Sequence, residues 1–180
     1  MAIRSDWSSC FPNYPTPDYT IVPFIKYASH PHSIDLTQYA EQSIWVLDHG
    51  RGRCNPLTSF PQFSSNGLII GPCLCTFETF AYRRVKLLPE YKFMIIEACG
   101  PNKAKIDGKI ADIYIDDELV GKLYVPDKEC VKESFNISQF ADDNYHTIKI
   151  VGKLYGKCTD ESIVISTISF SSKSEGSLIP

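Results

Sequence analysis

The stretch IADIYIDDELVGKLYV, residues 110–125, decides the fold class. Two runs of Ile, Val, Leu and Tyr, at 110–115 and 119–125, flank a short acidic segment. Acidic side chains accept hydrogen bonds from the backbone amides of a tight turn. The stretch therefore predicts two antiparallel strands joined by a turn at residues 116–118.

Runs of the same kind recur along the second half of the chain, each bounded by Gly, Asp, Asn, Ser or Pro. Short strands that repeat about every 10 residues are typical of an antiparallel β-sandwich. The run at 91–98 is apolar on both faces in its middle, which predicts a central strand. A phase shift between Ile165 and Ile168 predicts a β-bulge. The expected strands are 91–98, 110–115, 119–125, 135–140, 145–151 and 163–170.

The first half of the chain predicts less regular structure. A short helix is expected over residues 33–41, and the Gly, Pro and Ser content of residues 48–67 predicts a long loop. Residues 81–88 fit either a strand or a turn of helix. The other expected strands are 21–27, which Pro23 places at a sheet edge, 44–47, 68–70 and 74–80.

The size of the chain predicts one domain. Its 180 residues, 43% of them hydrophobic, suffice for one sizeable core, which we assign to a β-sandwich over residues 21–172. Residues 1–20 combine prolines with aromatic rings, so they predict an extended N-terminal arm that packs against its own domain or a neighbouring subunit. Residues 173–180 read as a polar tail.

Charge and hydropathy exclude several partners. The formal net charge is −3 and no basic stripe appears, so we expect no nucleic-acid partner. No apolar run approaches the roughly 18 to 20 residues that cross a bilayer, so we expect no membrane span. The first residues contain no apolar segment of the kind found in secretory signals. The N-terminal residues alone therefore do not predict where the protein is located.

Seven cysteines are scattered along the chain. Scattered cysteines on a β-rich frame predict cross-links in an oxidising setting, which favours an extracellular, appendage or virion-surface location. The odd count leaves one thiol free or paired to another chain, and Cys10 in the arm is the candidate for an intermolecular disulfide. Buried, unpaired cysteines are the alternative. The other disulfide candidates are Cys54, Cys73, Cys75, Cys99, Cys130 and Cys158.

Several segments in the second half resemble the galactose-binding-like jelly rolls, which include many carbohydrate-binding modules. The likeness spans roughly residues 85–170 and runs through IDG at 106–108, IYIDDELV at 113–120, SFNIS at 134–138 and NYHTIKI at 144–150. Asp117 and Asn144 stand where such proteins commonly have glycine. The resemblance implies a β-sandwich, and a carbohydrate partner bound through loops or the concave face.

Metal chemistry has weak candidates. Zinc ligands would come from His30, His32 and Cys54, or from Cys73 and Cys75, but a single C-x-C pair is less than a zinc motif needs. Calcium would need six to eight oxygen atoms converging on one point. The acidic hairpin is more simply explained by turn chemistry and solubility. We therefore expect no cofactor, with calcium as the alternative at Asp112, Asp116 and Asp117.

Covalent chemistry has equally weak candidates. A hydrolase would need a nucleophile and a base brought together in space, and only His49 and Cys54 share a loop. His146 lies in an apolar strand, so we expect a hydrogen-bonded core histidine. Asn136-Ile-Ser138 matches the acceptor for N-linked glycans. No catalytic residue is predicted.

Two function classes remain. The first is a structural or adhesive subunit that self-assembles into a filament, appendage or particle surface, with the arm reaching a neighbouring copy. The second is a lectin-like carbohydrate-binding module, since ten Tyr, ten Phe and two Trp supply rings for sugar stacking. A hydrolase using His49 and Cys54 is a third. The assembly arm would present Trp7, Phe11, Tyr14 and Tyr19.

Overall fold

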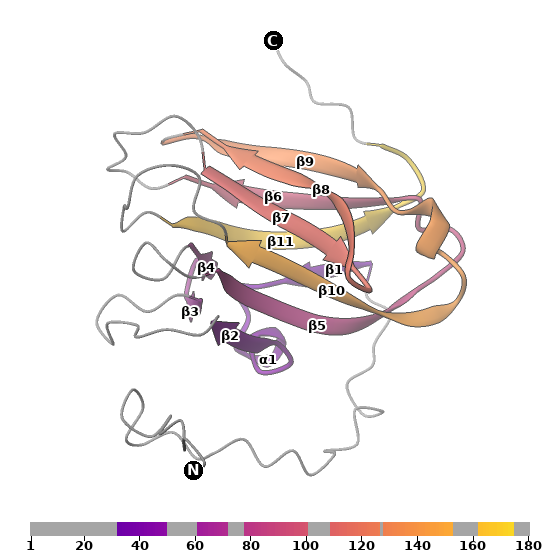
Figure 1. Cartoon of the computed structure of the whole chain (residues 1–180), viewed down its shortest axis with the longest axis horizontal. Helices are drawn as coiled ribbons and strands as arrows, with labels where there is room; N and C mark the ends of the chain where they lie inside the picture. Colours follow the sequence, from indigo (N-terminus) through magenta and orange to yellow (C-terminus); the bar gives the residue numbers. More distant parts are fainter. Residues whose placement is uncertain are drawn as a thin grey trace, which may run out of the picture.

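Two antiparallel sheets lie face to face and form the β-sandwich expected from the sequence (Figure 1). The computed structural model describes residues 32–49, 61–71, 78–100, 109–126, 128–152 and 162–174. No helix in this part of the chain is long and apolar enough to cross a membrane. The expected arm at 1–20 and the strands at 21–27 and 74–77 lie outside the described residues.

The first sheet has five strands in the order β2-β5-β10-β7-β8. The hairpin of residues 109–125 forms its β7–β8 edge, and Asp116 and Asp117 turn it with φ of 48° and 66°. Two successive residues with positive φ fit the tight turn that matches the twist of a hairpin. The strands are β2 (Val46–His49), β5 (Thr79–Leu87), β10 (Asn144–Gly152), β7 (Lys109–Ile115) and β8 (Glu118–Val125).

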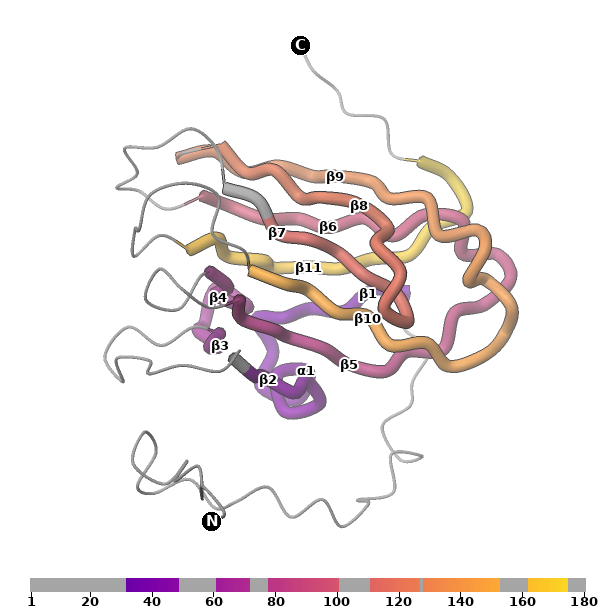
Figure 2. Tube along the Cα trace, viewed as in Figure 1, coloured from indigo at the N-terminus to yellow at the C-terminus, as the bar shows by residue number. Residues whose placement is uncertain are grey.

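The second sheet has six strands, and β11 is its centre. β11 pairs with β6 along one side, while β4 and β1 share the other side (Figure 2). A four-residue helix, α1 (Tyr39–Gln42), and the 3-10 helix η3 (Ser138–Phe140) complete the described elements. The strands are β1 (Ser33–Asp35), β3 (Gln62–Ser64), β4 (Gly67–Ile70), β11 (Ile163–Ser171), β6 (Phe93–Cys99) and β9 (Cys130–Asn136).

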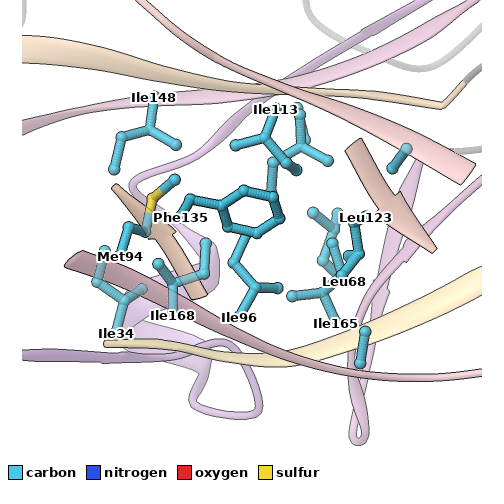
Figure 3. Packing of buried hydrophobic residues seen from close by; sticks show 14 of the residues in the cluster. Ile34, Leu68, Met94, Ile96, Ile113, Leu123, Phe135, Ile148, Ile165 and Ile168 are labelled. Carbon is cyan, nitrogen blue, oxygen red and sulfur yellow. The ribbon is translucent and has the colours of Figure 1, made fainter. Parts of the chain in front are cut away.

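The core fills the space between the two sheets with aliphatic side chains. Figure 3 shows Phe135 in the middle of this cluster, with Ile113 and Ile148 on one side and Ile96 on the other. Ile96, Ile113 and Ile148 are 0% exposed. Burying one such side chain stabilises the fold by about 1.5 to 3 kcal/mol. The alternation of side-chain direction along the strands therefore places aliphatic side chains of both sheets in one continuous core.

A glycine lies at the edge of the sandwich where β8 of one sheet runs beside β9 of the other. A Cβ on Gly121 would lie 2.5 Å from the ring of Phe135. Real Cβ atoms do not approach a ring so closely, so a side chain at this position would push β8 and β9 apart. Gly121 therefore allows Phe135 to reach the centre of the core.

A buried ion pair joins α1 to the inner side of the five-stranded sheet. Arg83 points inward from β5 with its side chain 0% exposed, and Nη1 donates to Oε2 of Glu41 in α1. Trp45, just before β2, is 6% exposed. Among the described residues, neither Nη2 of Arg83 nor Nε1 of Trp45 has a hydrogen-bond partner. Glu41 is thus the carboxylate that compensates this buried guanidinium.

Most expectations for the second half of the chain are confirmed. The all-β sandwich, the central position of β6 between β11 and β9, and the hairpin are all present. The pairing of β11 with β6 shifts between Ile165 and Thr167, which confirms the bulge. Residues 81–87 of the segment 81–88, which fitted strand or helix, belong to β5. His146 is 8% exposed and hydrogen-bonded, as expected for a core histidine.

Three local expectations were wrong. The strand expected at 135–140 lies earlier, at Cys130–Asn136, because only Val131, Glu133 and Phe135 point inward and this edge strand lacks an apolar run. The helix expected over 33–41 is a strand followed by a single helical turn. The loop expected over 48–67 contains β3, which forms by pairing with β4 across a turn at Gly67.

Candidate functional site

The outward face of the five-stranded sheet is the candidate site, and we call it the aromatic face. Along β5 the buried residues Ala81, Val85 and Leu87 point into the core, so the alternate residues point out. An outward sheet face needs only polar side chains to be soluble. Here the alternate positions instead carry five rings. They are Phe80, Tyr82, Tyr114, Tyr124 and Tyr145.

Two of the five rings on this face are exposed to solvent. Tyr145 is 43% exposed, Tyr124 is 48% exposed, and Leu119, which is paired in register with Tyr114, is 47% exposed. Phe80, Tyr82 and Tyr114 are half-buried within the face. Large side chains that stay exposed on a face of this kind mark surfaces for contact with a ligand or partner.

A lysine flanked by two tyrosines forms the middle of the aromatic face. Lys149 of β10 is paired in register with Tyr82 of β5 on one side and with Tyr114 of β7 on the other. Its Nζ lies 5.3 Å from the centre of the Tyr114 ring and 2.5 Å from Oδ1 of Asp117. The hairpin turn supplies that carboxylate. Lys149 is therefore held over the sheet by a ring and a carboxylate.

The next row of the face contains a buried carboxylate. Asp112 of β7 is 1% exposed, although it points outward. Nζ of Lys122 donates to its Oδ1 at 3.0 Å, and the hydroxyl of Tyr114 donates to its Oδ2 at 3.4 Å. These contacts restrict the Tyr114 ring before any ligand arrives, and a ring already held in place loses less entropy on binding.

Arg84 adds a second cationic side chain to the aromatic face, near the start of β10. Arg84 of β5 is exposed, and its guanidinium lies 5.6 Å from the centre of the Tyr145 ring. On β10 it is paired in register with Thr147. Guanidinium groups stacked on rings keep their N–H donors free to turn toward a ligand's oxygen atoms.

A histidine between two carboxylates fixes the end of the sheet next to this face. His146 Nδ1 lies 2.6 Å from Oδ2 of Asp116, and Nε2 lies 2.8 Å from Oδ1 of Asp142. Burial lowers the pKa of His146, but the hydrogen bonds to Asp142 and Asp116 outweigh it, so the pKa is raised. The hydrogen bond from His146 lowers the pKa of Asp142 from 3.8 to about 2. The cluster ties the hairpin turn to β10.

The cysteine expectations are tested only in part. Cys99 of β6 and Cys130 of β9 are opposite in register and form a disulfide. They lie on the outward face of the six-stranded sheet, the reverse side of the molecule from the aromatic face. The candidates Cys10, Cys54, Cys73, Cys75 and Cys158 lie outside the described residues.

The structure does not test several of the other predicted site residues. The arm residues Trp7, Phe11, Tyr14 and Tyr19 and the zinc candidate His30 are outside the described residues. His49 ends β2, but its side chain is not described, so the hydrolase arrangement remains a prediction.

The calcium candidates do not converge. Asp112 contacts Lys122, Asp116 contacts His146, and Asp117 contacts Lys149. Within the described ranges no three His, Cys, Asp or Glu side chains are grouped as a metal site requires. Each carboxylate instead contacts a different lysine or histidine side chain of the protein.

Sequence reasoning missed Tyr82, Tyr114 and Lys149 as site residues. The signal was present as aromatic and charged residues at alternate positions of the predicted strands 110–115 and 145–151 and of residues 81–88, which fitted strand or helix. It could not be interpreted without the strand order, because β5 and β7 meet only through β10. The aromatic content of the sequence permits a sugar-binding surface, but it did not identify one.

Comparison with known proteins gives the fold. No protein-family model and no curated protein matches the sequence. The solved structure of a carbohydrate-binding module, TmCBM27, which recognises mannan, matches with a TM-score of 0.51 at 13% identity, covering 78% of this chain and 95% of that one. The module CBM36, solved with calcium and xylotriose, matches with a TM-score of 0.49 at 10% identity over 77% of this chain and 98% of that one.

A third match has a named source. The CBM36-1 domain of a multidomain xylanase from the hindgut metagenome of Trinervitermes trinervoides matches with a TM-score of 0.45 at 11% identity, over 71% of this chain and 96% of that one. At these identities the likeness concerns the fold. The chain has an antiparallel β-sandwich fold similar to that of the carbohydrate-binding module TmCBM27.

Proposed function

We propose that this protein is a non-enzymatic carbohydrate-binding module that holds an oligosaccharide on the aromatic face. The observation that carries the proposal is the row Tyr82, Lys149 and Tyr114, in which two rings flank a fixed cation on a solvent-facing sheet. The fold supports it as well, because TmCBM27 has the same architecture and recognises mannan.

The chemistry of a sugar matches this mixture of groups. A pyranose has an apolar C–H face that stacks on an aromatic ring, and hydroxyl groups around its edge that need hydrogen-bond partners. Tyr82 and Tyr114 supply ring faces, while Lys149 and Arg84 supply donors. Neither kind of group alone would distinguish a sugar from a peptide or a lipid.

The spacing of the rings favours a chain of sugars. Tyr82 and Tyr114 lie on strands that are separated by β10, so two interstrand spacings, about 10 Å, lie between them. One pyranose ring cannot cover both tyrosines. Adjacent units of an oligosaccharide can, with Lys149 between them.

The test is calorimetric titration with oligosaccharides of mannan, xylan and galactan, from the monosaccharide to the hexasaccharide. We expect at least one series in which affinity rises with chain length. Tyr82→Ala and Tyr114→Ala should each weaken that affinity about tenfold, or ~1.4 kcal/mol. Phe93→Ala, which removes a ring from the outward face of the other sheet, is the matched control and should change nothing.

Two outcomes would end the proposal. One is the absence of binding to any member of the panel and to a broad glycan array. The other is an equal loss of affinity in Phe93→Ala and in the two tyrosine variants while all three remain folded. Self-assembly through residues 1–20 remains a separate prediction, and nothing in the described residues supports it.

A further inference from the structure

A single acceptor sequence for N-linked glycans occurs in the chain, Asn136-Ile137-Ser138. Asn136 is the last residue of β9 and Ser138 begins η3. Both are exposed, whereas Ile137 between them is 0% exposed. The buried isoleucine fixes the segment to the core and holds the asparagine and the serine at the surface.

The side-chain amide of Asn136 is oriented by its own turn. Its Oδ1 accepts a hydrogen bond from the backbone N–H of Ser138 at 3.0 Å. This contact uses the carbonyl end of the amide, and Nδ2 makes no hydrogen bond to any described residue. The nitrogen that would carry a sugar is thus the unoccupied end of an exposed side chain.

The disulfide supplies an independent observation about compartment. Cys99 and Cys130 join β6 to β9, the same strand that ends at Asn136. Disulfides form and persist in oxidising compartments such as the secretory route and the cell exterior. N-linked glycans are added to Asn-X-Ser/Thr in the secretory route. One location therefore accounts for both features of β9.

The position of Asn136 suits a glycan on this fold. Asn136 is paired in register with Phe93 on the outward face of the six-stranded sheet. The half-buried Phe93 ring offers apolar surface to the first sugar. A glycan here would project from the opposite side of the sandwich and leave the aromatic face open.

We propose that Asn136 carries an N-linked glycan and that the protein passes through a secretory route. In the transfer, Nδ2 of Asn136 attacks the anomeric carbon of an oligosaccharide held on a lipid pyrophosphate. A C–N bond forms, the C–O bond to the pyrophosphate breaks, the pyrophosphate leaves with the electron pair, and the amide loses one proton.

The test begins with protein purified from its own source, measured by mass spectrometry before and after treatment with peptide N-glycosidase. We expect the mass to fall on treatment and residue 136 to become aspartate, the mark that the enzyme leaves. Removing the glycan should leave the affinity of the aromatic face for oligosaccharides unchanged, so the result is read separately from the proposed function. An intact, unmodified Asn136 in the native protein would overturn the proposal.

Variants made in a eukaryotic host that secretes the protein supply the second measurement. Ser138→Ala keeps the backbone N–H that holds the turn and removes the acceptor hydroxyl, so we expect the glycan to disappear while the melting temperature changes little. Ser138→Thr preserves the acceptor and should keep the glycan. Asn144→Gln, at an exposed asparagine without the motif, is the matched control. A glycan that survives in Ser138→Ala would assign it to another site and overturn the proposal.

Discussion

The two outward faces of the sandwich follow the same alternation but carry different side chains. The aromatic face presents five rings among lysine, arginine and aspartate side chains. The outward side of the six-stranded sheet presents serines, aliphatic side chains, a disulfide and the ion pair Lys132–Glu97, and Phe93 is its ring among the described residues.

This difference separates contacts that stabilise the fold from the side chains that we propose bind a ligand. The six-stranded face has contacts that hold strands together, such as the disulfide between β6 and β9. The aromatic face has the exposed rings of Tyr124 and Tyr145, and a Tyr114 ring that contacts Lys149 and Asp112. Changes on the first face should therefore alter stability, and changes on the second should alter binding.

The largest expected change in stability comes from removing the Arg83–Glu41 ion pair, which lies on the inner side of the five-stranded sheet, beneath the aromatic face. Glu41→Gln leaves the guanidinium of Arg83 buried without a compensating charge, which should lower the free energy of unfolding by about 3 to 5 kcal/mol. Urea unfolding measures it. The double variant Glu41→Leu with Arg83→Met removes both charges and should cost much less. A loss below about 1 kcal/mol in Glu41→Gln would contradict the compensating role of Glu41.

The disulfide offers the next largest effect. Replacing Cys99 and Cys130 together with serine should lower the free energy of unfolding by about 3 to 4 kcal/mol, because the bond closes a loop with a sequence separation of 31. Glycan affinity of the folded variant should be unchanged. A weaker affinity at a temperature where the variant is still folded would show that the two faces are coupled.

Two lysines in similar ion pairs sharpen the comparison. Lys149→Gln removes the cation between Tyr82 and Tyr114 and should weaken oligosaccharide affinity about fivefold, or ~1 kcal/mol. Lys132→Gln removes the lysine that lies 3.2 Å from Glu97 on the other face and should leave affinity unchanged. Exposed pairs stabilise by about 0 to 1 kcal/mol, so both variants should fold normally. Equal affinities in the two variants would exclude Lys149 from the site.

The smallest effect concerns pH and the end of the sheet. The raised pKa of His146 stabilises the fold fully below its ordinary value near 6.5, and this contribution is lost as the pH rises through the raised value. The lowered pKa of Asp142 stabilises the fold above 3.8, and this contribution is lost as the pH falls toward about 2. Stability should therefore be greatest between about pH 4 and 6.

Urea unfolding across this range, repeated with His146→Gln, measures the contribution. The variant should lose the decrease on the alkaline side, because glutamine does not titrate. If the variant and the parent protein lose stability in parallel as the pH rises, another group is responsible.

The second half of the chain was largely predictable because its signals are local. Alternation in 110–125 places every other side chain on one face whatever surrounds it, so the hairpin and the sandwich class followed directly. The strand at Cys130–Asn136 was misplaced because its inward residues include Glu133, which interrupts the apolar pattern. β3 was missed because three residues form a strand only when a partner such as β4 lies beside them.

The sequence by itself determined that this protein is an antiparallel sandwich with rings and charges at alternate positions, since side-chain direction in a strand depends on the neighbouring residues alone. Only the tertiary structure decided that Tyr82, Lys149 and Tyr114 form one row. It also decided that Asn136 and the disulfide lie on the other side. Strand order and register come from contacts between distant segments, and the free energy of those contacts depends on the whole packed core.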